Sequence, residues 1–174
     1  ARRCTRSFSR RGFRLVSTRV TRREGLLHEG EAEDAAMVVK ICGITSPGDA
    51  GVAVEAGATA LGFVFWPRSP RYIEPRRARE IVSTLPAFVV PVGVFVNQPL
   101  AHVKGVASLV GLGAVQLHGD EDVLYAASLE CPVIKAVSVG ADGDAGRVDI
   151  WPRRTTVLLE VNDPVNRGGT GRTI

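Results

Sequence analysis

The sequence has 174 residues, of which 45% are hydrophobic and 6% aromatic, a composition that fits a globular protein with one sizeable core. No apolar run approaches the ~20 residues needed to cross a bilayer, so we expect no membrane partner. The net charge of +4 arises in residues 1–36, where nine arginines stand against five acids, and the neutral remainder argues against a nucleic-acid partner.

Residues 1–36 show no apolar periodicity and contain no acid before Glu24, so we predict a disordered basic extension. The segment is rich in Arg and Ser, as organelle transit peptides are. Met37, however, stands immediately before the first clear strand, which favours an extension that is not part of the native protein. We therefore expect two regions, residues 1–36 and a folded domain over residues 37–174. We expect a cytoplasmic location unless residues 1–36 are a genuine transit peptide.

The first predicted strand, residues 37–45, is a run of apolar and β-branched residues that brings Cys42 to its carboxyl end. A helix-start signal follows at once, because Ser46 suits an N-cap and Pro47 the first helical position. We expect this helix to run to about Ala56 and to end at Gly57.

The rest of the chain alternates in the same way. Strands are predicted over residues 60–65, 88–96, 114–117, 132–137 and 155–159, and helices over 75–85, 99–110, 121–129 and 140–150. Apolar strands that alternate with amphipathic helices predict an α/β fold with a parallel sheet. Eight units of roughly 23 residues would make a (β/α)₈ TIM barrel, and about six would make a doubly wound open sheet. The absence of a Gly-rich dinucleotide fingerprint after the first strand favours the barrel.

Polar side chains follow several of these strands and should gather at one end of the sheet: Cys42, Arg71, Gln116, His118 and Glu160. Each has an ordinary explanation as well. Cys42 fits a small core residue, Arg71 a solvated charge, and His118 a hydrogen-bonded loop residue. Together they supply a base, an acid and an anion clamp, which a sugar-phosphate isomerase requires. Asn97, after the third strand, is interpreted as structural.

The three cysteines, Cys4, Cys42 and Cys131, form neither a CxxC pair nor an even framework. This pattern predicts no metal site and no disulfide scaffold, and it suits a reducing compartment.

Five motifs then occur in order along the chain. They are Lys40-Ile41-Cys42-Gly43-Ile44-Thr45, Gly62-Phe63-Val64-Phe65 with Ser69-Pro70-Arg71-Tyr72-Ile73, Val92-Gly93-Val94-Phe95, Val115-Gln116-Leu117-His118-Gly119, and Gly168-Gly169-Thr170-Gly171-Arg172-Thr173. From about Val38 to Ile174 the chain resembles the phosphoribosylanthranilate isomerase (TrpF) family. The resemblance implies a (β/α)₈ barrel and an isomerase of tryptophan biosynthesis that needs no cofactor. Its substrate would be N-(5-phosphoribosyl)anthranilate, converted by general acid/base catalysis into 1-(2-carboxyphenylamino)-1-deoxyribulose 5-phosphate.

The resemblance also implies roles for single residues. Cys42 matches the general base, and Glu160 stands where the family has an aspartate as general acid. Arg71 matches the arginine that engages the anthranilate carboxylate, while Gln116 and His118 match residues that line the substrate pocket. Lys40, on the same side of the strand as Cys42, is expected to bind substrate or to favour the thiolate. Asp163 is an alternative acid, and Gly168, Gly169 and Gly171 would form a lid loop.

Counted in these units, the chain reaches only the loop after the sixth strand, so the barrel would be C-terminally truncated to about six βα units. The later loops are where such barrels commonly bind phosphate, and we expect the isolated chain to be unstable or inactive. Two other functions therefore remain open, a catalytically silent barrel fragment and another phosphosugar barrel enzyme. The sequence does not predict an oligomeric state.

Overall fold

The computed structural model describes residues 14–18, 38–139 and 148–161. These residues form one seven-stranded sheet whose strand order follows the chain from β1 to β7. Strands β2 to β7 pair in parallel, and β1 pairs antiparallel to β2. The strands are β1 (Arg14–Thr18), β2 (Val38–Cys42), β3 (Ala60–Val64), β4 (Val90–Phe95), β5 (Ala114–Leu117), β6 (Val133–Val139) and β7 (Thr156–Val161). The six parallel strands confirm the predicted number of strands in a parallel α/β sheet.

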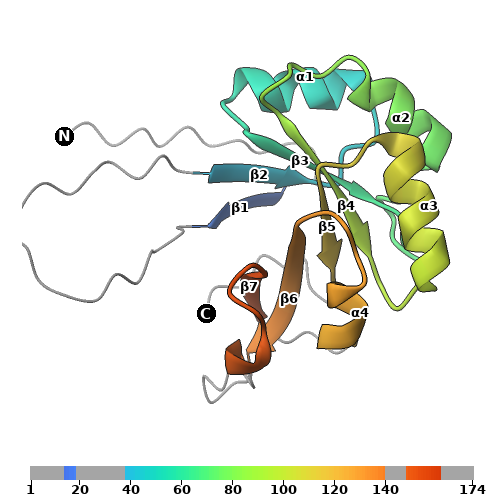
Figure 1. Ribbon diagram of the computed structural model, residues 1–174. Helices are drawn as coiled ribbons and strands as arrows, with labels where there is room; N and C mark the ends of the chain where they lie inside the picture. Colours follow the sequence, from blue (N-terminus) through green and yellow to red (C-terminus); the bar gives the residue numbers. More distant parts are fainter. Residues whose placement is uncertain (1–13, 19–37, 140–147, 162–174) are drawn as a thin grey trace, which may run out of the picture.

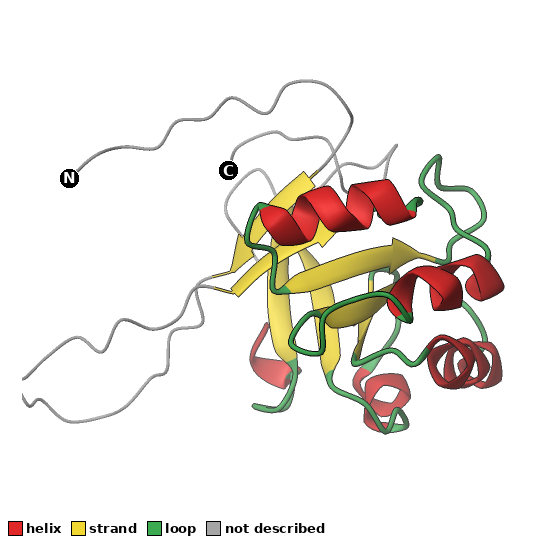
Figure 2. Cartoon of the chain, turned by 90° about the horizontal axis from the view of Figure 1, so that it is seen from above, coloured by secondary structure: helices red, strands yellow, loops and turns green. Residues whose placement is uncertain are grey.

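The sheet curls like part of a barrel wall, and the helices lie around its outside (Figures 1 and 2). They are α1 (Pro47–Glu55), α2 (Pro75–Val82), α3 (Leu100–Val110) and α4 (Val123–Ala127), and a 3₁₀ turn, Val148–Ile150, precedes β7. Only these last three residues of the predicted helix over 140–150 can be compared, because 140–147 lie outside the described residues. No helix in the described ranges is long and apolar enough to cross a membrane.

Helices α1, α2 and α4 begin where the local sequence supplies a side-chain acceptor, whereas α3 begins after Pro99 without one. Ser46 Oγ accepts from the backbone N–H of Asp49 at 3.1 Å, which confirms the predicted start of α1. Glu74 caps α2 in the same way, and Asp122 caps α4. The predicted strand over 132–137 is longer in the structure, where β6 continues to Val139.

Strand β1 differs from the sequence prediction, which left all of residues 1–36 outside the fold. Residues 14–18 pair with β2 along its whole length, from Arg14 opposite Cys42 to Thr18 opposite Val38. Without this partner the edge of β2 would present unpaired backbone groups, and a run with two β-branched residues suits an added strand. The division into residues 1–36 and 37–174 otherwise stays a prediction.

The main core lies between the sheet and the helices. Successive residues of a strand point to opposite faces, and the outward positions of the strands are fully buried, as at Leu61, Phe63 and Phe95. Helices α1 to α3 contribute small and branched residues to the same cluster, including Ala53, Ile81 and Val103. The rings of Phe65 and Phe95 stack with centroids 5.2 Å apart.

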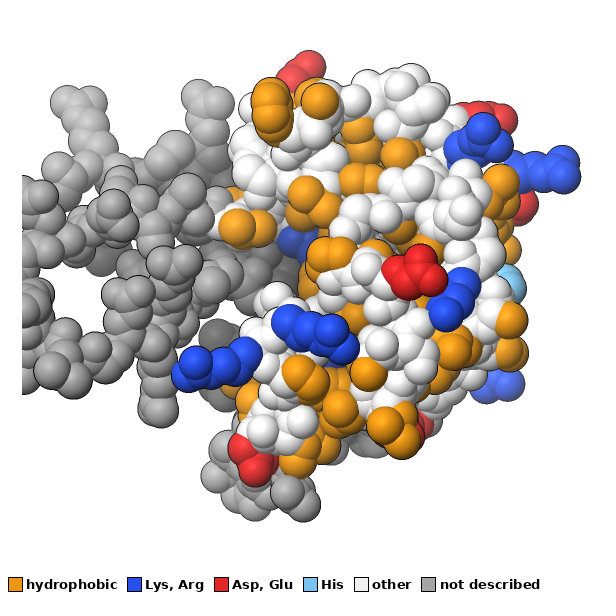
Figure 3. All heavy atoms as spheres, in the orientation of Figure 1, with side chains coloured by type: hydrophobic (Ala, Val, Ile, Leu, Met, Phe, Trp, Pro, Cys, Tyr) orange, Lys and Arg blue, Asp and Glu red, His pale blue; other side chains and the backbone are white. Residues whose placement is uncertain are grey.

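The opposite, inner face of the sheet carries a smaller apolar cluster. It is formed by Ala60, Val92 and Ala114, with Ile134 packed against them. These residues define the inner face, and any residue paired with one of them, or an even number of positions from it along a strand, points the same way. On the surface seen in Figure 3, acidic and basic side chains are interspersed among apolar ones.

A glycine inside α3 and the glycine that ends it should respond oppositely to substitution by alanine, and this difference tests the assigned bounds of the helix. A Cβ on Gly105, inside the helix, would meet nothing within 4 Å, so we expect Gly105→Ala to raise the free energy of unfolding by about 0.5–1 kcal/mol. Gly111 ends the helix at φ 76°, a left-handed conformation that costs other residues about 1–2 kcal/mol, so Gly111→Ala should be destabilising. Urea unfolding of both variants measures the difference, and a Gly105→Ala protein that is less stable than the wild type would contradict the helix assignment.

Candidate active site

The carboxyl ends of the parallel strands bring the predicted catalytic residues to one edge of the sheet. Cys42 is the last residue of β2, and Glu160 lies one residue before the end of β7. Cys42 pairs with Gly62, Gly62 with Val92, and Val92 belongs to the inner cluster, so the thiol faces inward. Glu160 pairs with Ser138, four residues after Ile134 on β6, so it also faces inward. The thiol and the carboxyl group therefore share one end and one face of the sheet.

The backbone after Cys42 is fixed by the neighbouring strand. The N–H groups of Gly43 and Ile44 both donate to the carbonyl of Gly62, at 2.9 and 3.0 Å. Gly43 has φ 91°, and a Cβ there would lie 2.5 Å from Cδ of Arg71. The loop between β3 and α2 thus lays the side chain of Arg71 across the turn that follows Cys42. The structure therefore brings together the predicted base and the predicted anion clamp.

A second group of predicted residues forms a hydrogen-bonded row. Gln116 is 2% exposed, and its Nε2 lies 3.0 Å from Nδ1 of His118. The other ring nitrogen of His118, Nε2, lies 3.0 Å from Oε2 of Glu160. An amide N–H only donates, so Nδ1 accepts, and a neutral imidazole then carries its hydrogen on Nε2, facing the carboxylate. The row therefore orients the candidate acid through His118.

Lys40 also reaches this part of the sheet. It is two residues before Cys42 on β2 and shares its inward face, as predicted. The residue is 5% exposed, and within the described ranges its Nζ has no hydrogen-bond partner. The only other such buried side-chain atom in those ranges is Oε1 of Gln116.

Sequence analysis missed a buried ion pair beside this row. Lys135 Nζ, on β6, lies 2.9 Å from Oε2 of Glu121 and donates to the carbonyl of Gly119. The same carboxylate accepts from the backbone N–H groups of Asn97 and Gly119, at 2.7 and 2.9 Å. The pair thus ties together the loops after β4 and β5, next to His118. The available signal was a lysine within an otherwise apolar strand.

Asn97 belongs to the same hydrogen-bonded group as Glu121 and Lys135, and it has a structural role there. Its φ is 51°, its Nδ2 donates to Oδ2 of Asp120 at 2.9 Å, and its Oδ1 accepts from the backbone N–H of Asp120 at 2.6 Å. A Cβ on Gly119 would clash with that Oδ1 and would lie 2.9 Å from the backbone N of Asn97, so this position requires glycine. These contacts agree with the structural interpretation of Asn97 made from the sequence.

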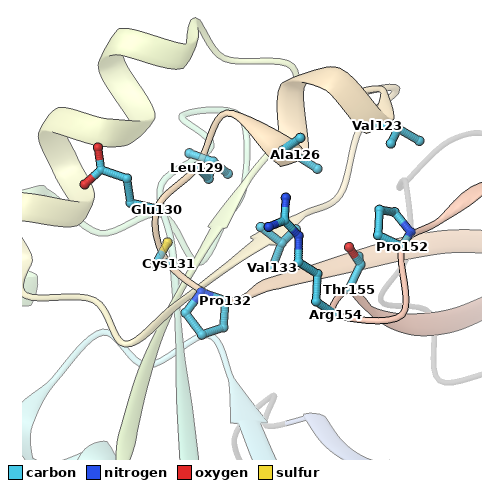
Figure 4. Close-up of a pocket in the computed structure, with 11 residues that line it drawn as sticks. Val123, Ala126, Leu129, Glu130, Cys131, Pro132, Val133, Pro152, Arg154 and Thr155 are labelled. Atoms are coloured by element: carbon cyan, nitrogen blue, oxygen red, sulfur yellow. The ribbon is translucent and has the colours of Figure 1, made fainter.

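A cavity of about 280 Å³ lies at the other end of the sheet, between α4 and the starts of β6 and β7 (Figure 4). Its lining includes Cys131, Pro132 and Thr155, which precede these strands. Burial, with a further contribution from Glu130, raises the pKa of the Cys131 thiol. Cys131 is therefore separated from the candidate site and is a poor thiolate source. Asp163 and the predicted lid residues Gly168, Gly169 and Gly171 lie outside the described residues.

Known proteins resemble this chain over the same region. The family model described as N-(5'phosphoribosyl)anthranilate (PRA) isomerase matches residues 39–174. The protein named N-(5'-phosphoribosyl)anthranilate isomerase from Syntrophus aciditrophicus is 46% identical over 134 residues, covering 76% of this chain and 58% of that protein. The protein of the same name from Thermotoga neapolitana is 48% identical over 136 residues, which cover 77% of this chain and 65% of that protein. The chain thus spans less than two thirds of the length of these relatives.

Solved structures give the same result. The phosphoribosyl anthranilate isomerase of Thermotoga maritima superposes with a TM-score of 0.67 at 46% identity, over 74% of this chain and 63% of that one. A second solved structure is a phosphoribosyl anthranilate isomerase in complex with reduced 1-(o-carboxyphenylamino)-1-deoxyribulose 5-phosphate. It superposes with a TM-score of 0.67 at 48% identity, over 71% of this chain and 64% of that one. Since the family model matches residues 39–174 and these relatives are 46–48% identical over about three quarters of the chain, the chain belongs to the N-(5'-phosphoribosyl)anthranilate isomerase family.

Proposed function

We propose that the protein isomerises N-(5'-phosphoribosyl)anthranilate to 1-(2-carboxyphenylamino)-1-deoxyribulose 5-phosphate in tryptophan biosynthesis. The observation that carries this proposal is the shared position of Cys42 and Glu160, which face inward at the same end of the sheet in a member of this family. A thiol and a carboxyl group so arranged supply the base and the acid that an aldose-to-ketose rearrangement requires.

The first step needs an acid at the ribose ring oxygen. Glu160 delivers a proton there, the bond between that oxygen and C1 breaks, and the nitrogen lone pair forms a C1=N iminium. A carboxyl group partly withdrawn from water suits this task, and the side chain of Glu160 is 13% exposed. His118 holds the group in place through Oε2.

The second step needs a base at C2. The iminium acidifies the C2 hydrogen, and the thiolate of Cys42 removes it, so that the C–H electron pair forms a C1=C2 bond and the iminium pair returns to nitrogen. The resulting enolamine becomes the ketone when C1 gains a proton and the C2 hydroxyl loses one. Thiolate is the reactive form of cysteine, and Cys42 is partly exposed at the mouth of the site.

The remaining predicted residues suit substrate binding. A guanidinium fits a carboxylate in a bidentate pair, so Arg71, lying over the turn after Cys42, would hold the anthranilate carboxylate. Gln116 and His118 lie on the inward side near Glu160 and would contact the sugar.

Replacing Cys42 by Ala removes the proposed base, and we expect turnover to fall about 10²–10⁴-fold while the reduced product analogue still binds. Cys131→Ala is the matched control, because Cys131 lies at the opposite end of the sheet and should leave turnover close to that of the wild type. Steady-state kinetics of the two variants check this, and undiminished turnover in Cys42→Ala would exclude the role.

Replacing Glu160 by Gln keeps the size of the side chain and removes its proton, so kcat should also fall about 10²–10⁴-fold. Glu160→Asp retains a carboxyl group but shifts it by roughly 1 Å, so it should keep more activity than Glu160→Gln. Asp163→Asn is the comparison variant. If Asp163→Asn abolished turnover and Glu160→Gln did not, Asp163 would be the acid.

A further inference from the structure

Two lysines of the sheet are equally buried but differently partnered. Lys40 on β2 and Lys135 on β6 are each 5% exposed. Lys135 Nζ contacts the Glu121 carboxylate at 2.9 Å and the Gly119 carbonyl, and it lies 5.7 Å from the centroid of the Trp151 ring. Lys40 Nζ has no hydrogen-bond partner in the part of the chain that the structure describes.

Lys40 points into the candidate active site. A Cβ built on Gly62 would lie 3.1 Å from Lys40 Nζ and 2.8 Å from Cys42 Sγ. The ammonium and the thiol therefore both lie close over Gly62, and they can do so because position 62 has no side chain. A ligand atom that approaches Cys42 from this side also approaches Lys40.

Burying an ammonium group without a partner is strongly unfavourable. Lys135 shows how this sheet compensates a buried lysine, with a carboxylate and a carbonyl. Among the described residues none compensates Lys40 in this way, although a methionine would fill similar space without a charge. A residue kept at such a cost to stability is best explained by a partner that arrives with the ligand.

We propose that Lys40 binds the C2 oxygen of the substrate, on the carbon from which Cys42 takes the proton. This inference rests on the proposed isomerase function. In the final step the C2 hydroxyl of the enolamine loses its proton to water, the O–H electron pair forms the C2=O bond, and the C1=C2 electron pair takes up a proton at C1. During this step the ammonium donates a hydrogen bond to the oxygen and stabilises the negative charge that develops there. No atom is transferred to or from Lys40.

The chemistry of the other unpartnered atom agrees with a hydroxylated ligand. Gln116 Oε1 is an acceptor on the same inner face, and it too lacks a hydrogen-bond partner among the described residues. Lys40 is a donor only, and Gln116 Oε1 is an acceptor only. The open-chain pentose of the substrate has hydroxyl groups that both donate and accept, so it can form hydrogen bonds with both atoms.

The test compares Lys40→Met with Lys135→Met in the intact protein, because the two substitutions are identical and the sites are equally buried. Without ligand, Lys40→Met should raise Tm by about 2–4 °C, since it removes a buried charge that has no partner among the described residues. Lys135→Met should lower Tm, since it leaves the buried Glu121 carboxylate without its cation. A lower Tm for Lys40→Met would overturn the proposal, because Lys40 would then be a paired structural residue.

Binding gives the second readout, with reduced 1-(o-carboxyphenylamino)-1-deoxyribulose 5-phosphate as the probe. We expect Lys40→Met to bind it about tenfold or more weakly, as for loss of a hydrogen bond to a charged group, and to lower kcat about 100-fold. Lys40→Gln, which keeps a donor and removes the charge, should recover part of the affinity and little of kcat. If Lys40→Met fails to fold, Lys40→Gln is used in its place for the binding and turnover measurements.

The outcomes separate this inference from the proposed function. Suppose that the wild-type protein binds the probe and turns over substrate. If Lys40→Met then binds the probe as tightly as the wild type, only the role of Lys40 is overturned. Probe binding that depends on Lys40 in a protein without turnover would support the binding site and overturn the isomerase activity. A wild-type protein that neither binds the probe nor turns over substrate would overturn both.

Discussion

The parallel pairing of β2 through β7 is the constraint on which the candidate site depends. In this arrangement every strand ends at the same edge, so side chains far apart in sequence, such as Cys42 and Glu160, are delivered to one place. The helices cover the outer face and take up its apolar side chains. Polar groups needed for chemistry are thereby confined to the inner face and to the loops at the carboxyl ends.

Burial makes the pairing of these polar groups informative. A buried donor or acceptor that lacks a partner lowers stability, so the buried polar residues can be divided by how they are satisfied. The Glu121–Lys135 pair closes on itself and on backbone groups, which gives it a structural role beside His118. The row from Gln116 through His118 reaches Glu160, which orients a group expected to move a proton. Lys40 Nζ forms no hydrogen bond with any described residue. This difference from Lys135 is the reason for proposing a ligand contact at Lys40.

Local sequence predicted the elements well where the physics is local. The start of α1 at Ser46 and the end of α3 at Val110 were predicted, because capping and backbone preferences involve only neighbouring residues. The addition of β1 to β2 could not be foreseen in this way, because an edge that lacks a partner is a property of the assembled sheet. The Glu121–Lys135 pair was missed for the same reason. Fourteen positions separate the two residues in sequence, and only the neighbouring β5 and β6 bring them together.

The sequence by itself determined the alternation of strands and helices, the family motifs, and the placement of Cys42, His118 and Glu160 at strand ends, because periodicity and motif order are written along the chain. Only the tertiary structure decided which of these side chains share a face, that His118 contacts Glu160, and that the buried Lys135 has a carboxylate partner while Lys40 has none within the described ranges. Those facts depend on strand register and on the packing of side chains from neighbouring strands. Register and packing arise only when several strands come together.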